Sequence, residues 1–275
     1  MSVEITVLLE NTKPAQSDYE VEHGLSLLVK TERSEFIFDC GRTGIAWNNA
    51  ALMGIDLSKI QFVILSHSHY DHAAGFPSLL KYVSIDKLYT GINFWREKFS
   101  YNADSKEYKY SGCGFNEEEL SNWNINQIVC KDLIKLDDDT WLISNFVKKY
   151  SFETIPSKFV CGEDKRPDDF SDEIVLVIRE RDGVAVITGC AHNGILNIVT
   201  TIQQRFNLPV YSVIGGIHLK GLNEERIIKT IDELKKIGVK RFALCHCSGE
   251  EVHKYLLSNE IMDYKISTGS IIKFE

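Results

Sequence analysis

The stretch His67-Ser68-His69-Tyr70-Asp71-His72-Ala73-Ala74-Gly75 constrains the fold and the chemistry of this chain more than any other. It follows the apolar run Phe62-Val63-Ile64-Leu65, so three imidazoles and a carboxylate are predicted to crowd the end of one strand. Imidazole nitrogen and carboxylate oxygen are ligands that zinc, iron and manganese accept. Histidines this close would charge together near neutral pH and repel each other, unless something separates or binds them. The stretch therefore predicts a transition-metal site rather than a polar loop.

The same arrangement recurs along the regular part of the chain. An apolar strand ends, a histidine lies at or just beyond its end, and a helix is predicted next, at His192, His218 and His246. Layered α/β folds assemble their sites on the loops beyond strand ends, and strands that run in a common direction would bring these ends to one edge. His192 and His246 are therefore candidate ligands. For His218, a ligand role and an acid or anion-binding role are both open.

The composition is that of a globular protein with a sizeable core, since 44% of its 275 residues are hydrophobic and 25% are charged. A net charge of -8 argues against nucleic acid or an anionic membrane as a general partner. No apolar run approaches the roughly 20 residues that span a bilayer, and no signal peptide is visible, so a cytoplasmic location is expected. The seven cysteines are scattered without a CxxC pair, which argues against a disulfide framework. Self-association is left open.

One domain is expected over residues 1–275. β structure opens the chain, a short helix is predicted from Ala46 to Met53, and a longer helix is predicted after Asp71. From Asp172 onward, strands alternate with helices. Residues from about 90 to 170 show weak periodicity and frequent aromatic side chains, and they are expected to form an irregular cap within the domain. That cap would either cover the core or line a substrate pocket with its aromatic residues.

The motif His67-x-His69-x-Asp71-His72 after an apolar strand resembles the signature of the metallo-β-lactamase superfamily, and Asp39-x-Gly41 is similar to another of its landmarks. The resemblance covers essentially the whole chain. It implies an α/β fold of four layers, an αββα sandwich, with a site for one or two metals at the edge between the two sheets. Several stretches also resemble a narrower group of the superfamily, the proteins similar to dihydropterin ribofuranosylaminobenzene phosphate synthase. They are Glu22–Ser26, Ser66–His72, Thr188–Ile195 and Gly215–Leu219.

Carried over to this chain, the resemblance implies two metal positions with separate ligands. His67, His69 and His192 would bind the first metal, and Asp71, His72 and His246 would bind the second. The superfamily usually supplies a bridging Asp where this chain has Cys190, so either the thiolate replaces that ligand or the bridge is absent. One or two divalent ions are expected as cofactors, zinc above all, with iron or manganese as alternatives.

A metal-dependent hydrolase with a small-molecule substrate is the function that this site favours. The metal would lower the pKa of a water molecule and polarise the scissile group. Asp71 would orient that water as well as bind metal, and His218 would protonate the leaving group. The cationic centre favours a small anionic ester, such as a phosphodiester or a phosphorylated metabolite. The alternatives are an iron-binding redox or electron-transfer protein, suggested by the cysteines near the predicted centre, and a non-catalytic metal-dependent binder, suggested by the aromatic segment.

Overall fold

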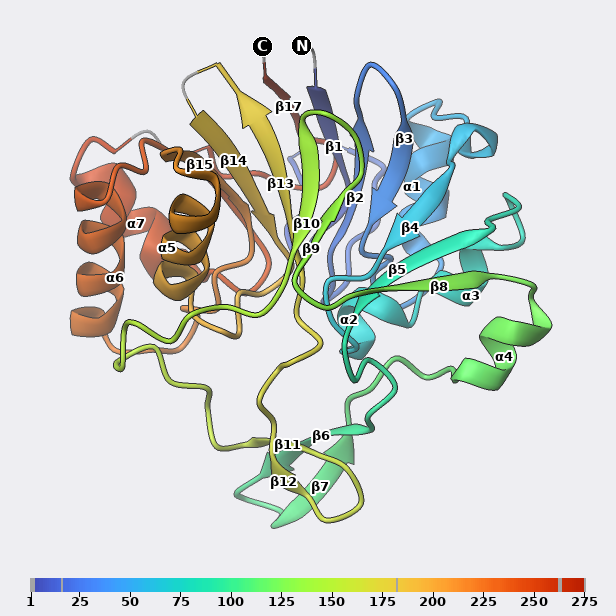
Figure 1. Cartoon of the computed structure of the whole chain (residues 1–275), viewed down its shortest axis with the longest axis horizontal. Helices are drawn as coiled ribbons and strands as arrows, with labels where there is room; N and C mark the ends of the chain where they lie inside the picture. Colours follow the sequence, from blue (N-terminus) through green and yellow to red (C-terminus); the bar gives the residue numbers. More distant parts are fainter. Residues whose placement is uncertain (1–2, 16, 182, 262–263, 275) are drawn as a thin grey trace.

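Two β-sheets packed face to face form the body of the protein. The computed structural model describes residues 3–15, 17–181, 183–261 and 264–274. Helices cover the outer face of each sheet, and a small third sheet lies beyond one end of the sandwich, at the bottom of Figure 1. The predicted αββα sandwich is confirmed.

The first sheet has the strand order β17-β1-β2-β3-β4-β5-β8. Its strands, in chain order, are β1 (Val3–Leu9), β2 (Ser26–Lys30), β3 (Glu35–Phe38), β4 (Phe62–Ile64), β5 (Lys87–Gly91), β8 (Asn126–Cys130) and β17 (Ile271–Phe274). Strands β3, β4, β5 and β8 run parallel, whereas the pairs from β17 to β3 are antiparallel. The helical segments of this half are α1 (Ile45–Leu52), the 3-10 helix η1 (Leu57–Lys59), α2 (Tyr70–Ala73), α3 (Phe76–Leu79) and α4 (Glu117–Asn122).

The second sheet has the strand order β16-β15-β14-β13-β10-β9. Its strands are β9 (Leu133–Lys135), β10 (Thr140–Ile143), β13 (Val175–Glu180), β14 (Gly183–Thr188), β15 (Val210–Gly215) and β16 (Arg241–Leu244). Strands β14, β15 and β16 run parallel, and α5 (Ile195–Phe206), α6 (Glu224–Lys236) and α7 (Glu250–Ser258) cover the outer face. Asn223 caps α6, because its side chain accepts a hydrogen bond of 2.9 Å from the Arg226 amide.

Alternating side chains build the layers of the sandwich. In β2, Leu27 and Val29 pack in the core between the sheets, whereas Leu28 packs under the helices of the first half. In β13, Leu176 belongs to the core between the sheets and Val177 to the core beneath α5 and α6. Successive side chains of a strand point to opposite faces, so strands that are apolar throughout can join two cores at once.

The longer helix predicted after Asp71 is wrong, because α2 and α3 are separate four-residue segments. The break lies at Gly75, whose backbone amide donates to the Gly41 carbonyl at 3.0 Å instead of continuing the helix. A Cβ atom at Gly75 would lie only 2.0 Å from the Cys40 carbonyl oxygen. The close approach of these two loops therefore decides the backbone path beside the histidine motif.

The segment from about 90 to 170, expected to be an irregular cap, is divided between core and cap. Strands β8, β9 and β10 belong to the two large sheets. The remaining strands form a separate sheet, called the cap sheet below, with the order β12-β11-β6-β7. They are β6 (Lys98–Asn102), β7 (Glu107–Tyr110), β11 (Phe159–Cys161) and β12 (Arg166–Pro167).

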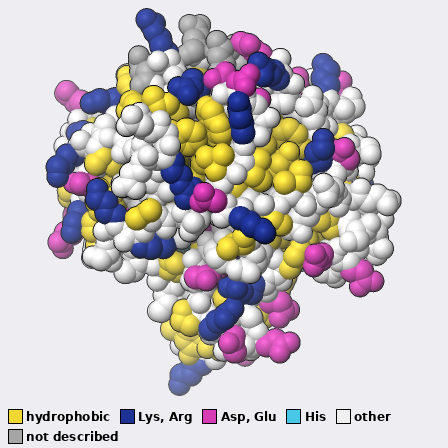
Figure 2. Space-filling model, in the orientation of Figure 1, with side chains coloured by type: hydrophobic (Ala, Val, Ile, Leu, Met, Phe, Trp, Pro, Cys, Tyr) yellow, Lys and Arg dark blue, Asp and Glu magenta, His cyan; other side chains and the backbone are white. Residues whose placement is uncertain are grey.

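The surface shown in Figure 2 carries charged side chains of both signs. Hydrophobic side chains gather over β13, β10 and β2, where the two sheets face each other. Across the described ranges of the chain, none of the helices is both long enough and apolar enough to cross a bilayer.

Candidate metal centre

The predicted ligands come from strand ends of both large sheets and meet at one edge of the sandwich. In the first sheet, β4 leads into His67, and α2 begins directly after His69. In the second sheet, β14 leads to Cys190 and His192, and β16 leads to His246. All seven residues predicted as metal ligands fall into overlapping groups of three, and within each group the ligand atoms lie within 4.8 Å of one another. The strand ends therefore bring the seven predicted ligands together, and their binding of a metal stays a prediction.

The first position is formed by His67, His69 and His192. His67 Nε2 lies 3.1 Å from His69 Nδ1, close to the separation of about 3.3 Å expected for two nitrogens on one tetrahedral zinc. The Nε2 atom of His69 and both ring nitrogens of His192 are buried, and they have no hydrogen-bond partner within the described part of the chain. Buried polar atoms are normally satisfied, and a metal held by His67 Nε2 and His69 Nδ1 would give one ring nitrogen of His192 a partner.

The second position is formed by Asp71, His72, His246 and Cys190. His72 Nε2 lies 3.1 Å from His246 Nε2 and 3.2 Å from Cys190 Sγ. Asp71 Oδ2 lies 3.4 Å from His246 Nε2 and 3.8 Å from His72 Nε2. Two nitrogens, one sulfur and one carboxylate oxygen therefore point at the same small volume.

Hydrogen bonds fix which ring nitrogens of the second position carry lone pairs. His72 Nδ1 donates to Asp39 Oδ2 at 2.7 Å. His246 Nδ1 faces Asn11 Oδ1 at 3.0 Å, and that oxygen already accepts a hydrogen bond from the Gly24 amide at 3.2 Å. Because the Nδ1 atoms are the donors, both Nε2 lone pairs face each other, and only a proton or a metal ion can lie between them.

Asp39 contacts one imidazole of each position, His72 directly and His67 through Ser66. Besides binding His72, it accepts hydrogen bonds of 2.7 Å from the Ser66 amide and from Ser66 Oγ. Ser66 Oγ in turn accepts from His67 Nδ1 at 2.9 Å, which leaves His67 Nε2 free for a metal. Asp39 lies at the end of β3 with φ of 61°, a conformation that is uncommon for residues with a side chain. Such outer carboxylates orient metal-binding imidazoles.

The two positions differ in charge. Burial lowers the pKa of His67, His69 and His192 well below the ordinary histidine value, so these rings are neutral at pH 7 and can bind a metal. Burial also opposes protonation of His72, but the carboxylates of Asp39 and Asp71 outweigh it and raise the pKa of His72 to about 9. Carboxylates that hold a proton on a buried imidazole favour a cation at this point, and a divalent ion would replace that proton.

Comparison with known proteins agrees with this geometry. Residues 19–90 match the family model of the metallo-β-lactamase superfamily. The crystal structure of Tm1679, a metal-dependent hydrolase of the β-lactamase superfamily, has 28% sequence identity and a TM-score of 0.81, with 98% of each chain covered. The family model and the shared architecture both indicate the fold of the metallo-β-lactamase superfamily.

Two proteins of Methanocaldococcus jannaschii are also similar to this chain. One is 7,8-dihydropterin-6-methyl-4-(beta-D-ribofuranosyl)-aminobenzene-5'-phosphate synthase, which is 28% identical over 99% of this chain and 97% of the relative. The other is an uncharacterised protein, 27% identical over 89% of this chain and 90% of its own length. A diphosphatase of the PhnP family, at 14% identity and a TM-score of 0.56, shares the fold. Relatives thus include a synthase and a hydrolase.

Cys190 lies between the two positions. Its sulfur groups with His67 and His72 and also with His246 and Cys247, so it reaches ligands of both positions. In the absence of metal, burial raises the pKa of the Cys190 thiol well above the ordinary value. A metal would favour the thiolate, because a coordinating thiol loses its proton.

His218 stands apart from the metal ligands, since it belongs to none of the groups whose atoms could hold an ion among the described residues. Its ring centroid lies 4.4 Å from that of His192, and its side chain lines a cavity of about 480 Å³ that opens onto the centre. Burial, with a smaller contribution from Lys158, lowers the pKa of His218 to about 4.

The cap sheet supplies one wall of this cavity, and that wall is partly cationic. Lys109 and Lys158 line the cavity together with the aromatic rings of Tyr110 and Phe159. Lys220, which follows His218, lines it from the second sheet. Aromatic residues of the cap therefore line the cavity, as one of the two alternatives expected, and lysines share that lining.

Sequence reasoning missed several residues around the centre. His23 Nε2 lies 3.1 Å from Asp71 Oδ2, and the His23 ring stacks on His246 at a centroid distance of 4.8 Å. Asn11 orients His246 through the hydrogen bond at Nδ1. The stretch Glu22–Ser26 pointed to His23 only by resemblance. Asn11 carried no recognisable signal.

Proposed function

We propose that this chain is a metal-dependent hydrolase of the metallo-β-lactamase superfamily that acts on a small anionic ester, such as a phosphodiester or a phosphorylated metabolite. One observation carries the proposal: the cavity over the metal ligands is lined by Lys109, Lys158 and Lys220. The chain as a whole has a net charge of -8, so three lysines around one cavity are a local reversal of sign. Such a focus of positive charge attracts and orients an anion.

The ligands of both positions would hold one or two divalent ions, which supply Lewis-acid activation of a water molecule and of the scissile group. Asp71 lines the cavity as well as the second position, so its carboxylate could orient the attacking water. His218 lies beside His192 and lines the same cavity. We assign it a hydrogen bond to the anion and, where the bound anion raises the pKa of its imidazole, the protonation of the leaving group.

The substrate proposal also draws on the relatives. The synthase of M. jannaschii is named for a compound that carries a 5'-phosphate, and an anionic group of that kind suits the lysine-lined cavity. The identity of the ester is left to experiment, because a cavity of about 480 Å³ admits many small molecules.

The test is a panel of phosphodiester, thioester and lactam substrates offered to protein loaded with zinc, manganese or iron. We expect turnover of a phosphodiester that is lost in His69→Ala together with bound metal. Lys158→Met should raise KM for an anionic ester and leave KM for a neutral ester unchanged. Hydrolysis that persists unchanged in His69→Ala would overturn the proposal.

A second candidate, an iron-based redox or electron-transfer protein, is favoured by the sulfur at the centre. Cys190 and Cys247 form a group with His246, and thiolate ligands shift metal preference towards softer ions. The absorption spectrum of untreated protein separates the candidates. A coloured protein that is bleached by a reductant supports the redox function, and a colourless zinc protein excludes it.

A further inference from the structure

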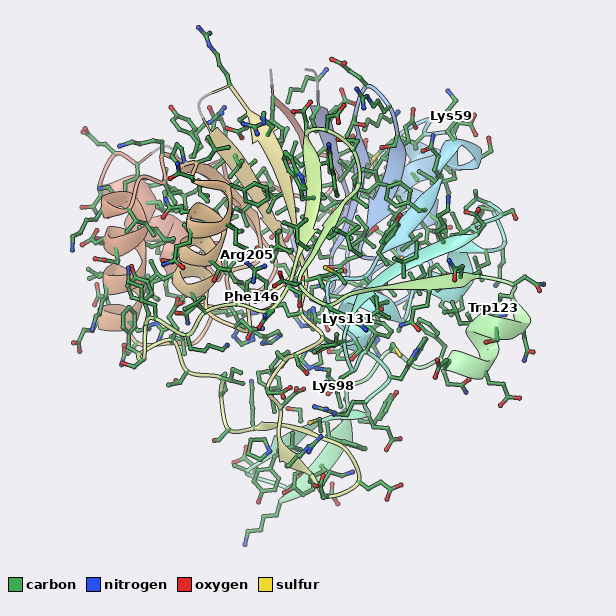
Figure 3. All side chains as sticks on the ribbon, in the orientation of Figure 1. Lys59, Lys98, Trp123, Lys131, Phe146 and Arg205 are labelled. Carbon is green, nitrogen blue, oxygen red and sulfur yellow. The ribbon has the colours of Figure 1, made fainter. Side chains whose placement is uncertain are left out.

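Lys98 is a buried lysine at the base of the cap, where β6 begins. Its side chain is 2% exposed, and it lies between the cap sheet and the two large sheets (Figure 3). Its Nζ atom lies 2.6 Å from Asp172 Oδ1 and 2.8 Å from Asp168 Oδ2, and both carboxylates are also 2% exposed. Buried charges are costly to desolvate, so three of them in contact call for a role beyond packing.

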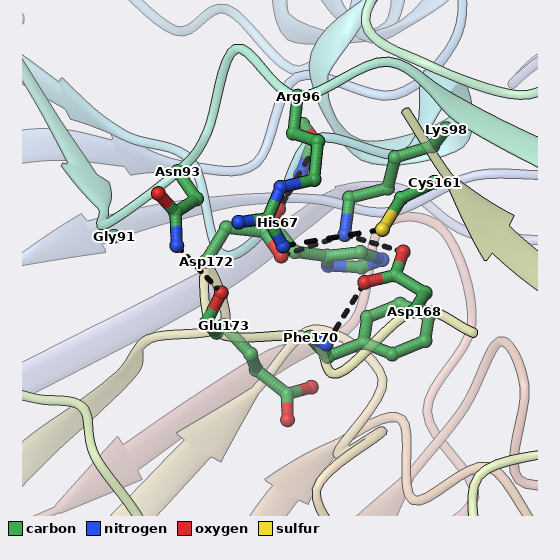
Figure 4. Close-up of polar contacts among 12 residues, drawn as sticks. His67, Gly91, Asn93, Arg96, Lys98, Cys161, Asp168, Phe170, Asp172 and Glu173 are labelled. Carbon is green, nitrogen blue, oxygen red and sulfur yellow. Dashed lines mark hydrogen bonds and ion pairs between the residues drawn. The ribbon is translucent and has the colours of Figure 1, made fainter. Parts of the chain in front are cut away.

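Asp172 connects Lys98 to the loop that carries the first two metal ligands. One carboxylate oxygen binds Lys98 (Figure 4). The other accepts hydrogen bonds from the Ser68 amide at 2.8 Å and from Ser68 Oγ at 3.0 Å. Ser68 lies between His67 and His69 in the chain. A shift of the Asp172 carboxylate would therefore move both imidazoles.

The same segment holds the third ligand of the first position. The Phe170 ring stacks on His192 with a centroid distance of 3.8 Å, and Lys98 Nζ lies 4.3 Å from the centroid of that ring. Asp168 Oδ1 accepts a hydrogen bond of 2.9 Å from the Phe170 amide, which fixes the turn that carries the ring (Figure 4). Glu173 accepts hydrogen bonds from the His192 amide at 2.7 Å and from the Asn193 amide at 2.8 Å.

We propose that Lys98 is a positioning residue that couples the cap sheet to the first metal position. Its ammonium group holds Asp168 and Asp172 in place, and through them it sets the His67–His69 loop and the ring that backs His192. The inference rests on metal binding by the proposed enzyme and not on the reaction that the enzyme catalyses. It assigns a function to a residue that touches neither the metal ligands nor the cavity.

The experiment compares Lys98→Met with the parent protein in cobalt titrations that follow the absorption bands of the bound ion. Lys98→Met keeps the length of the side chain and removes its charge. We expect about a 10-fold weaker affinity at the first position, which is the lower end of the range for outer partners of metal ligands. The visible bands of the cobalt protein should also shift, because the ligand geometry changes. A purely structural role would lower the unfolding temperature and leave these bands where they are.

Lys135→Met is the matched control, since Lys135 forms an exposed ion pair of 2.8 Å with Asp138, and it should change nothing in the cobalt titration. Asp168→Asn, which leaves the contact between Lys98 and Asp172, should give a smaller effect and carries the test if Lys98→Met does not fold. Folded variants with the cobalt affinity and spectrum of the parent would overturn the inference. A parent protein that binds no cobalt would instead contradict the proposed metal centre.

Discussion

The two metal positions are built from different ligands, and different parts of the molecule orient them. The second position has a carboxylate, a thiol and two imidazoles, and the hydrogen bonds that those imidazoles donate to Asp39 and Asn11 orient them. The first position has imidazoles only. His67 alone is linked to Asp39, through Ser66, whereas packing and backbone contacts orient His69 and His192.

Because their imidazoles are oriented differently, the two positions should lose metal affinity in response to different substitutions. Hydrogen bonds to a ring nitrogen fix both the tautomer and the angle of an imidazole, whereas ring packing fixes only its plane. Disturbing a hydrogen-bond partner should therefore harm the second position most, and disturbing a packing partner should harm the first. Asp39 is the exception, because it contacts both.

Asp39→Ala should have the largest effect, because it removes the one group that supports both positions. The change leaves His72 Nδ1 and the Ser66 amide without their partner in a buried site. We expect affinity to fall by about 100-fold at both positions, the upper end for outer partners, and stability to fall by about 2–4 kcal/mol. Calorimetric zinc titration and urea unfolding measure the two effects. Asp138→Ala, at an exposed ion pair, is the control, and loss at only one position would show that Asp39 is not shared.

Cys190→Ser should come next, because it replaces a ligand atom of the second position. In the cobalt protein, we expect the sulfur-to-metal charge-transfer band to vanish, with affinity at the second position about 10- to 100-fold weaker. Cys40→Ser changes a buried thiol outside the metal groups and should keep the band. A parent protein without the band would show that Cys190 is not a ligand, and the second position would then resemble the first more closely.

Asn11→Ala should weaken only the second position, by about 10-fold, because it removes the partner of His246 Nδ1. The two positions can be followed separately by titrating cobalt into protein whose first site holds zinc. Asn11→Asp keeps an oxygen acceptor and should restore most of the affinity. Equal weakening of metal binding at both positions would show that Asn11 does not act on the second position alone.

Phe170→Leu should have the smallest effect and should be confined to the first position. A stacked ring pair contributes about 1 kcal/mol, so we expect about a fivefold loss of affinity there. Phe206→Leu, at a ring that packs on Trp141 in the second half, provides a matched control for the lost aromatic volume. If Phe170→Leu weakens metal binding at the second position as much as at the first, the packing of Phe170 on His192 does not orient the first position alone.

The candidate ligands and their closeness in space were predictable from the sequence, but the groups that orient them were not. The stretch from His67 to His72 is a local motif, and His192 and His246 were found because strand ends of one direction share an edge. The contact of Asn11 with His246 spans 235 positions of the chain. It depends on the left-handed backbone of His246, at φ of 56°, and no periodicity signals such a conformation.

Lys98 and the helix after Asp71 both show that a local sequence pattern does not reveal long-range contacts. Lys98 follows a polar, aromatic stretch in which a lysine predicts exposure, yet two distant carboxylates bury it. The helix was predicted too long because Gly75 packs against the Cys40 carbonyl, a contact between loops that only the assembled fold reveals. Local pattern predicts which elements form, and long-range contacts decide where they break.

The metal content of the parent protein, His192→Ala and His246→Ala tests the central claim most directly. His192 belongs to the first position and His246 to the second, and the two residues share no group of candidate ligands. After zinc loading and dialysis, elemental analysis should give two ions for the parent and one for each variant. The zinc that remains should be bound without cysteine in His246→Ala and with cysteine in His192→Ala, as X-ray absorption would show. A parent with a single ion that either substitution removes would contradict an account with two distinct positions.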